Sequence, residues 1–454
     1  MLLRSPLRRD LALVNANAAV WAVGNGLVST TLVIYLALAL GAPGKAIGLI
    51  LAAPRLAGVL RLGAPLLLTH ARRRKPLCLG LLTGSAAVLG VLPHAAAPRW
   101  WAGGESAAGL ASGAGLAVLV GCWCVYHLLE YLGVVLLWSW LGDLMRGPVR
   151  GRLIGQRESC LVIGRVVGMT ASFALVAVWR WLAPDAPRWA PLGWSAGIGA
   201  AVLLASVLPL WWVSPREAAT DAPQRQNHTP LRAMLACLVD PRYRRLLVFS
   251  VCFSLANGIS ITAQSLYPQR VLGVTYPVIL GLRCAMRGGQ ALLAPAAGWW
   301  MDKRGAPALL IVSQLLVATC PLFFFAATPD RWWWLAGAFA AWTAYAGVNV
   351  GLDCLKLSLA PPGPAAPALA VYYGTSDLAI GVMAVAGGFV FDYLTEGGAD
   401  AAWLYGVLFL VGWAARTAVA TLLVGIDKPP GEPPVTTRSD SAAAGWLSSS
   451  ERRS

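Results

Sequence analysis

The sequence has little charge and few side chains suited to metal or redox chemistry. Only 12% of its 454 residues are Asp, Glu, Lys or Arg, whereas a soluble domain carries about 25%. It has four histidines, and none of its nine cysteines forms a C-x-x-C pair. We therefore expect small buried thiols, no metal site and no cofactor. The chain also lacks the G-x-x-x-x-G-K-[ST] motif, so ATP does not drive it directly.

Most of the sequence consists of long apolar runs. Hydrophobic residues make up 57% of the chain, and its mean hydropathy is +0.64. Many runs exceed 20 residues, which is enough to cross about 30 Å of hydrocarbon. The first run is too long for a signal sequence, so we expect an uncleaved span. The sequence predicts an all-α polytopic membrane protein with twelve transmembrane helices, at about 11–40, 46–70, 76–97, 113–141, 154–180, 190–213, 243–272, 275–300, 305–327, 331–359, 366–391 and 401–426.

Basic residues orient these helices. With the N-terminus in the cytoplasm, 22 lysines and arginines fall in inside segments and 6 in outside loops. This bias obeys the positive-inside rule and places both termini in the cytoplasm. Arginine, alanine and glycine are abundant, which is typical of GC-rich coding. We therefore expect a multi-pass protein of the plasma membrane of a bacterium, its inner membrane.

A polar stretch divides the chain into two halves. We expect a cytoplasmic N-terminus, a first six-helix bundle, a central cytoplasmic loop, a second six-helix bundle and a disordered cytoplasmic tail. Their ranges are 1–10, 11–213, 214–242, 243–426 and 427–454. Within the loop, the segment that begins at Pro230 has the pattern of a short amphipathic helix on the inner leaflet.

The two halves share an internal repeat at an offset of 232 residues. Positions 25–60 and 257–292 share ten identities without a gap, where chance would give about three in so apolar a composition. The matches include Asn25-Gly26 with Asn257-Gly258, Tyr35 with Tyr267, and Arg55 with Arg287. A membrane protein built from two copies of one unit is typical of transporters, which bind solute where the copies meet.

Two loop motifs carry a resemblance to a known family. Gly298-Trp-Trp-Met-Asp302-Lys303-Arg304-Gly305 matches the pattern G-x-x-x-D-[RK]-x-G, whereas the first-half copy is degenerate and has Thr69 at the acidic position. Asp143 precedes Arg150-Gly151 in a second pattern, an acid followed by R-G-x-x-x-G. With twelve spans and two halves, the chain resembles the major facilitator superfamily of secondary transporters over residues 10 to 427.

This resemblance implies a cytoplasmic gate built from the loop motifs. Its residues would be Arg73, Arg74, Asp143, Arg150, Gly298, Asp302, Lys303 and Gly305. A carboxylate at a helix C-terminus opposes the macrodipole, so Asp143 needs a cationic partner such as Arg73 or Arg74. The alternative is that these charges only anchor the topology.

Charged groups inside the spans are the candidates for a solute pathway, because an ion at mid-bilayer costs several kcal/mol unless it faces a partner or water. The family arrangement implies that Asn25, Glu130, Asn257 and Asn349 face the pathway, with Arg55, Arg165, Arg287 and Asp377 close behind. Alternatively, Glu130 and Arg165 form a static pair, and Arg55 and Arg287 brace helices. We expect Asp353 and Lys356 to pair locally and Arg416 to snorkel to the interface.

His127 lies one turn before Glu130 on the same helix face. Such a pair could carry a proton, or the histidine could simply be satisfied by its neighbour. Basic groups hint at an anionic solute, but Glu130 and Asp377 could neutralise them, so the sequence leaves the substrate open.

The sequence therefore predicts a monomeric secondary transporter, not an enzyme, in the lipid bilayer. It would move a small solute by alternating access, with proton coupling as an open possibility and no nucleic-acid partner. A membrane-embedded enzyme is disfavoured because the H-E-x-x-H motif is absent. A transporter-like sensor or lipid-handling protein without coupled transport stays open, because Thr69 replaces the acid of the loop motif.

Overall fold

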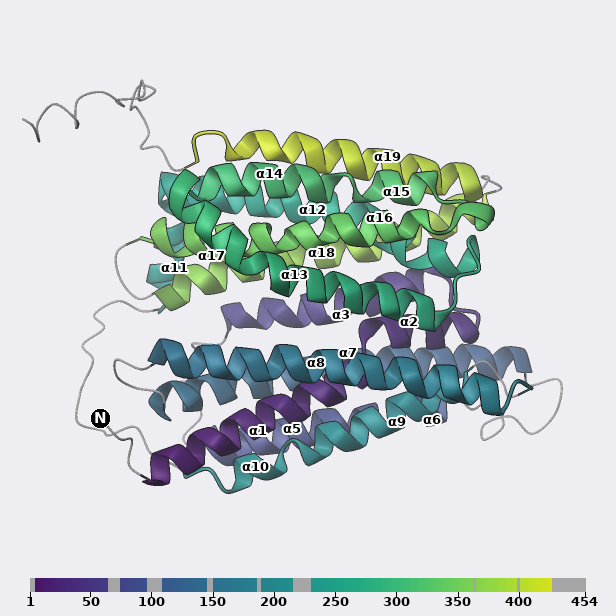
Figure 1. Cartoon of the computed structure of the whole chain (residues 1–454), viewed down its shortest axis with the longest axis horizontal. Helices are drawn as coiled ribbons and strands as arrows, with labels where there is room; N and C mark the ends of the chain where they lie inside the picture. Colours follow the sequence, from purple (N-terminus) through teal and green to yellow (C-terminus); the bar gives the residue numbers. More distant parts are fainter. Residues whose placement is uncertain are drawn as a thin grey trace, which may run out of the picture.

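The computed structural model describes residues 5–63, 74–95, 108–144, 150–185, 189–214, 230–361, 365–397 and 401–426, and within these ranges the chain is helical, with no strand (Figure 1). Helical segments occupy each of the twelve expected positions. This architecture follows from the solvent, since hydrocarbon offers no partner to backbone N–H and C=O groups and a helix satisfies them internally.

Two groups of helices follow one another along the chain. The first comprises α1 (Ser5–Leu27), α2 (Thr30–Ala39), α3 (Gly44–Gly58) with η1 (Val59–Leu62), α5 (Arg74–Leu89), α6 (Leu92–Ala95), α7 (Ala108–Leu144), α8 (Arg150–Leu182), α9 (Ala190–Ala205) and α10 (Leu208–Trp211). The second comprises α11 (Pro230–Val239), α12 (Pro241–Arg270), α13 (Tyr276–Arg304), α14 (Ala306–Ala318), α15 (Cys320–Ala326), η4 (Pro329–Arg331), α16 (Trp334–Ala341), η5 (Trp342–Ala344), α17 (Tyr345–Ser358), α18 (Ala365–Glu396) and α19 (Ala401–Val419) with η6 (Ala420–Leu423).

The outer surface of the bundle suits lipid. Nine helical runs in the described part of the chain are long and apolar enough to span a membrane, and α3, α5 and α13 fill the other three positions. Large apolar side chains lie exposed on the outside, such as Trp181 (81% exposed) and Trp211 (62% exposed). An exposed apolar surface of this extent marks contact with a membrane rather than with water. The chain is therefore an all-α, multi-pass membrane protein.

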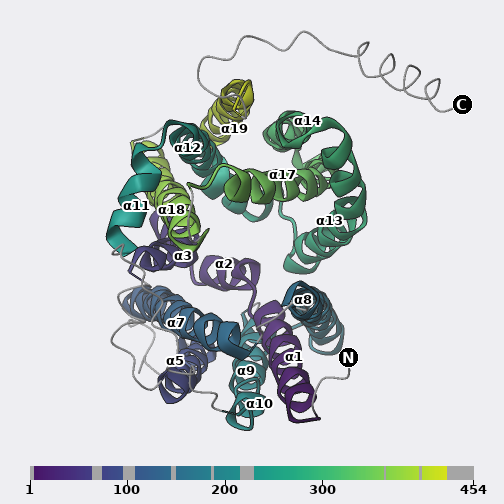
Figure 2. The same ribbon diagram turned by 90° about the vertical axis from the view of Figure 1, so that its left-hand side faces the viewer.

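The helices run roughly parallel, and the described chain begins and finishes at one end of the bundle, where α11 also lies (Figure 1). We call this the terminal end and the other the opposite end. Seen along the helices, α1, α5 and α7–α10 gather on one side and α12–α19 on the other, with α2 and α3 between them (Figure 2). Long-range packing of α3 against α18, and of α8 against α13, joins the two groups.

The expected first span is divided, because α1 ends at Leu27 and α2 begins at Thr30. Ser29 caps α2 by accepting a hydrogen bond from the Leu32 N–H at 3.3 Å. The freed carbonyl of Leu27 accepts a hydrogen bond from the Ser195 hydroxyl at 3.1 Å. The repeat-related Asn257-Gly258 lies inside an unbroken α12, so only the first copy breaks near its Asn-Gly pair.

The segment at Pro230 forms the helix α11, as expected. Cys237 is buried against the second group, whereas Leu231 and Leu235 are 65% and 51% exposed. The helix therefore has one face packed on protein and another apolar face that is free.

Close packing of α1 against α8 depends on small residues, as in many membrane helix pairs. A Cβ added at Gly168 would lie 2.1 Å from the Val23 carbonyl oxygen, and one at Gly26 would lie 2.5 Å from the Arg165 carbonyl oxygen. Backbones this close admit no side chain at either position.

Gly168→Ala should therefore lower the melting temperature of the detergent-purified protein, since overpacking costs about 1–3 kcal/mol. Gly121→Ala is the matched control, because Gly121 lies in α7 with open space around its Cβ position. We expect the control to leave the melting temperature unchanged or to raise it, since alanine favours a helix over glycine. Equal effects of the two substitutions would contradict the proposed α1–α8 contact.

Candidate functional site

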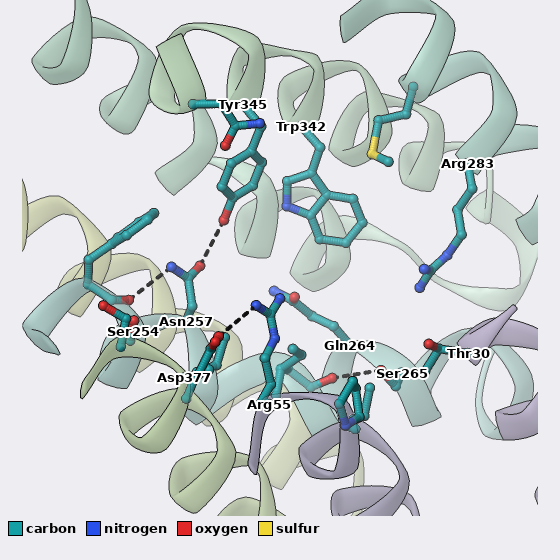
Figure 3. Close-up of a pocket in the computed structure, with 18 of the residues that line it drawn as sticks. Thr30, Arg55, Ser254, Asn257, Gln264, Ser265, Arg283, Trp342, Tyr345 and Asp377 are labelled. Atoms are coloured by element: carbon teal, nitrogen blue, oxygen red, sulfur yellow. Dashed lines mark hydrogen bonds and ion pairs between the residues drawn. The ribbon is translucent and has the colours of Figure 1, made fainter. Parts of the chain in front are cut away.

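A cavity of about 790 Å³ lies between the two helix groups. Residues of α2 and α3 line it from the first group, and residues of α12, α13, α15, α16–α18 and α19 line it from the second. Figure 3 shows Arg55 and Asp377 facing each other, Tyr345 and Trp342 on another wall, and Arg283 projecting into the space between Trp342 and Thr30. A cavity of this size, lined by both polar and aromatic groups, suits a small molecule.

Asn257 organises one wall of the cavity. Its Nδ2 donates to the Phe253 carbonyl at 2.9 Å, and its Oδ1 accepts a hydrogen bond from the Tyr345 hydroxyl at 3.2 Å. Tyr345 begins α17 directly after the 3-10 turn at Trp342–Ala344. Gln290 of α13 donates to the Trp342 carbonyl of this turn at 2.9 Å. The interruption, within what we predicted as one span at 331–359, thus exposes backbone that α13 satisfies from inside the cavity.

Arg55 and Asp377 form an ion pair across the helix groups, with Nη1 and Oδ1 3.3 Å apart. The Arg55 side chain is 50% exposed and that of Asp377 is 12% exposed. Arg55 therefore reaches from α3 into the cavity and meets a carboxylate of α18 at the wall. The pair braces the two groups and also presents charge to the cavity.

Other predicted pathway residues lie within the first group. Asn25 of α1 donates to the Tyr126 hydroxyl of α7 at 3.3 Å. His127 and Glu130 are both buried, with Nδ1 and Oε2 3.2 Å apart. The described residues show no ion pair between Glu130 and Arg165, so the carboxylate finds its partner on its own helix.

The structure thus separates the nine predicted pathway residues into two sets. Arg55, Asn257, Arg287, Asn349 and Asp377 share the cavity wall. Asn25, His127, Glu130 and Arg165 are not among the residues that line it.

The separation has a structural cause in α3, which packs against both α7 and α18. Trp123 of α7 donates to the Ile50 carbonyl of α3 at 3.0 Å, and the His127 ring lies edge-on to Trp123 with centroids 4.4 Å apart. Residues of α3 line the cavity and none of α7 is among them, so α3 lies between this part of α7 and the cavity.

Two cavity residues were missed or misplaced by sequence reasoning. Arg283 lies one turn before Arg287 on α13 and lines the cavity; the signal was present as an ionisable residue within a span. Arg416 is 2% exposed and lines the cavity from α19. It does not snorkel to the interface as expected, since its Nη2 donates to the Ser260 hydroxyl of α12 at 3.1 Å.

Lys356 confirms the expected local pair. Its Nζ lies 2.5 Å from the Asp353 carboxylate and 2.7 Å from the Tyr373 hydroxyl, while only 5% of its side chain is exposed. The local pair and the tyrosine hydroxyl together allow this lysine to be buried without a charge left uncompensated.

Hydrogen bonds join the two helix groups at the opposite end of the bundle. The Asp392 carboxylate of α18 accepts hydrogen bonds from the backbone N–H groups of Gly44 and Lys45 at 2.6 and 2.7 Å. It therefore caps the N-terminus of α3, where the macrodipole favours a negative charge. The Tyr35 hydroxyl donates to the Val274 carbonyl at 2.9 Å, and Arg270 donates to the Ala42 carbonyl.

The predicted cytoplasmic gate falls largely outside the described residues. Arg73 lies outside them, and so do the side chains of Arg74, Asp143, Arg150 and Asp302, so the pairing of Asp143 stays a prediction. In the second half, Gly298 lies in α13 and Gly305 joins α13 to α14 with φ of 82°, which favours glycine. Lys303 lies over the Trp299 ring, with its Nζ 3.9 Å from the centroid.

One serine carries an enzyme-like pattern that sequence reasoning missed. Gly193-Trp-Ser195-Ala-Gly197 matches G-x-S-x-G, which requires a strand–turn–helix setting to make a nucleophile. Ser195 instead lies within α9, fully buried, and donates to the Leu27 carbonyl. Its hydroxyl also lies 2.8 Å from the Ser172 hydroxyl. The serine therefore acts as a polar contact between helices.

No family model matches the sequence, and no curated protein sequence matches it. Solved structures match its fold at 13–15% identity. A mutant of the nucleoside transporter NupG gives a TM-score of 0.68 at 13% identity, covering 92% of this chain and 100% of that chain. A D-xylose-proton symporter gives 0.64 at 15% identity, over 92% and 97% of the two chains. A bacterial homologue of the human lysosomal transporter Spinster, inward-facing and unoccupied, gives 0.61 at 13% identity, over 94% and 96%. The chain therefore has the major facilitator fold, as the loop motifs predicted.

Asp392→Asn should weaken the contact between the groups at the opposite end. The substitution removes the charge from the α3 N-terminus and leaves one oxygen to accept two N–H groups, which we expect to cost about 1–2 kcal/mol. The melting temperature of the purified protein should fall. Asp330→Asn is the control, because Asp330 lies exposed in η4 with no helix of the first group to cap. A melting temperature for Asp392→Asn equal to that of the control would refute the cap.

Proposed function

We propose that this chain is a secondary transporter that moves a small solute across a bacterial plasma membrane by alternating access. The observation that carries the proposal is the cavity, which both helix groups line, together with the hydrogen bonds that join the groups at the opposite end. A site between two movable groups can be exposed to either side by tilting one against the other. The groups would correspond to residues 11–213 and 243–426.

The described state would have its cavity open toward the terminal end. Arg287 and Asn349 line the cavity and are nevertheless exposed, so solvent reaches them. The bias in lysine and arginine predicts that the terminal end is cytoplasmic, so the state would face inward. The inward-facing relative noted above and a partially occluded inward-open structure of the xylose transporter XylE from E. coli, with a TM-score of 0.57, support this assignment.

Coupling to protons is the finer part of the proposal, and Glu130 with His127 would carry it. Both side chains are 11% exposed, and the His127 Nε2 is buried with no hydrogen-bond partner among the described residues. A histidine and a carboxylate within hydrogen-bonding distance at this depth could pass a proton between them. Because α3 separates Glu130 from the cavity, a proton there would act through helix packing rather than by touching the solute.

Reconstitution into liposomes tests the proposal. Nucleosides, pentoses, organic acids and phosphate should be offered as labelled solutes, and at least one should enter saturably above protein-free liposomes. Asn257→Ala should lower that uptake about tenfold, because losing one hydrogen-bonding residue in the wall costs about 1.4 kcal/mol. Asp330→Asn should leave it unchanged. If no solute enters but a ligand changes binding to another protein or to lipid, the alternative of a sensor or lipid-handling protein is favoured.

Glu130→Gln tests proton coupling in the same liposomes. We expect this variant to lose accumulation driven by a pH gradient while it still exchanges labelled for unlabelled solute, since exchange needs no net proton movement. His127→Gln shows whether the imidazole shares the task. Accumulation by Glu130→Gln that still follows the pH gradient at the wild-type rate would rule out Glu130 as the coupling carboxylate.

A further inference from the structure

The cavity wall carries more positive than negative charge. Its cationic residues are Arg55, Arg283, Arg287, Lys356 and Arg416, whereas its acidic residues are Asp353 and Asp377. Asp377 forms an ion pair with Arg55, and Asp353 forms one with Lys356. The described part of the chain therefore supplies no carboxylate partner to Arg283, Arg287 or Arg416.

Two of these arginines lie on one face of α13. Arg283 and Arg287 are four residues apart, so their side chains are neighbours on the helix surface and repel each other. The Arg287 Nη1 donates to the neutral Gln290 Oε1 at 2.9 Å, and the Arg283 Nε is buried without a hydrogen-bond partner among the described residues. Figure 3 shows the Arg283 side chain directed into the cavity. The Arg283 guanidinium therefore lies at the cavity without a carboxylate partner among the described residues.

The internal repeat allows Arg287 to be compared with its equivalent in the first half, Arg55. Arg55 and Arg287 are equivalent positions of the repeat. Arg55 pairs with Asp377 of α18. Arg287 has only the neutral Gln290 as a hydrogen-bond partner and no carboxylate partner among the described residues. One copy of the repeat thus has its arginine neutralised, whereas the other does not.

Arg416 adds a buried charge behind the same cavity. Its Nη2 donates to the Ser260 hydroxyl, whereas its Nε and Nη1 are buried and have no partner among the described residues. Lone buried charges are strongly destabilising, so a protein retains them where a ligand or partner compensates them. An anion in the cavity would compensate the arginines of both helices, α13 and α19.

We propose that the solute is a small anion whose carboxylate or phosphate oxygens bind Arg283 and Arg287. This rests on the transport function proposed above. The planar guanidinium forks match both carboxylate and phosphate oxygens. Neighbouring Trp342 offers an apolar surface to the body of the solute.

The experiment measures the melting temperature of the full chain in detergent at constant ionic strength. The probes are inorganic phosphate and succinate, with the neutral solutes xylose and uridine alongside. We expect phosphate or succinate to raise the melting temperature by about 3 °C or more at saturation, and neither neutral solute to do so. A response to only one of the two anions shows whether the group that accepts the arginine hydrogen bonds is a phosphate or a carboxylate.

Arg283→Gln and Arg287→Gln should each abolish this anion-dependent shift. Without ligand, both variants should be at least as stable as the wild type, because the substitution removes like-charge repulsion; a purely structural arginine would show the reverse. Arg331→Gln, in η4 and outside the cavity wall, is the matched control and should keep the full shift. If one variant does not fold, the other still decides the point.

Three results would overturn the proposal. The first is a shift with xylose or uridine but with neither anion, which leaves the transport function intact and refutes the anionic solute. The second is an anion shift that persists in both variants. The third is no shift with any probe together with no uptake of any solute into liposomes, which refutes the transport function itself.

Discussion

The structure depends on one constraint, that a charge within hydrocarbon must face a partner, water or a ligand. Asp353 with Lys356 and Arg55 with Asp377 meet it by pairing. His127 and Glu130 meet it by pairing with each other inside the first group. The remaining arginines of α13 and α19 border the cavity instead. These arginines, which have no carboxylate partner among the described residues, therefore surround the polar cavity.

The two copies of the internal repeat make similar tyrosine and glycine contacts, but their arginines have different partners. Tyr35 and Tyr267 are equivalent, and each donates from its hydroxyl to a backbone carbonyl, of Val274 and of Ala327. The Asn-Gly pairs keep close helix contacts, Gly26 against α8 and Gly258 against α18. The two copies differ at the arginines, since Arg55 pairs with an acid of α18 whereas Arg287 has no carboxylate partner among the described residues. Equivalent positions of the repeat thus have different partners at the cavity.

Much of the fold could be predicted because its signals are local. Hydropathy located the spans, and the positions of basic residues suggested an orientation. The i,i+3 spacing of Asp353 and Lys356 predicted their pair, and the Gly298–Gly305 motif indicated the fold. The site was predicted less completely. Arg283, like Arg287, is an ionisable residue within a predicted span, but it was not predicted to lie in the pathway. Arg416 was predicted to lie at the interface, because depth along a helix is uncertain by a turn when the helix ends are inferred from sequence.

The sequence by itself determined that the chain crosses a membrane many times and that it carries an internal repeat, because composition and period act over one helix at a time. Only the tertiary structure decided which ionisable residues meet. It placed α3 between α7 and the cavity, which separates Glu130 from Asn257, and it paired Arg55 with Asp377 across 322 positions of sequence. Such contacts depend on which helices pack together and on which face each helix turns toward its neighbour. Both depend on close packing of small residues between helices rather than on hydrophobicity along any one helix.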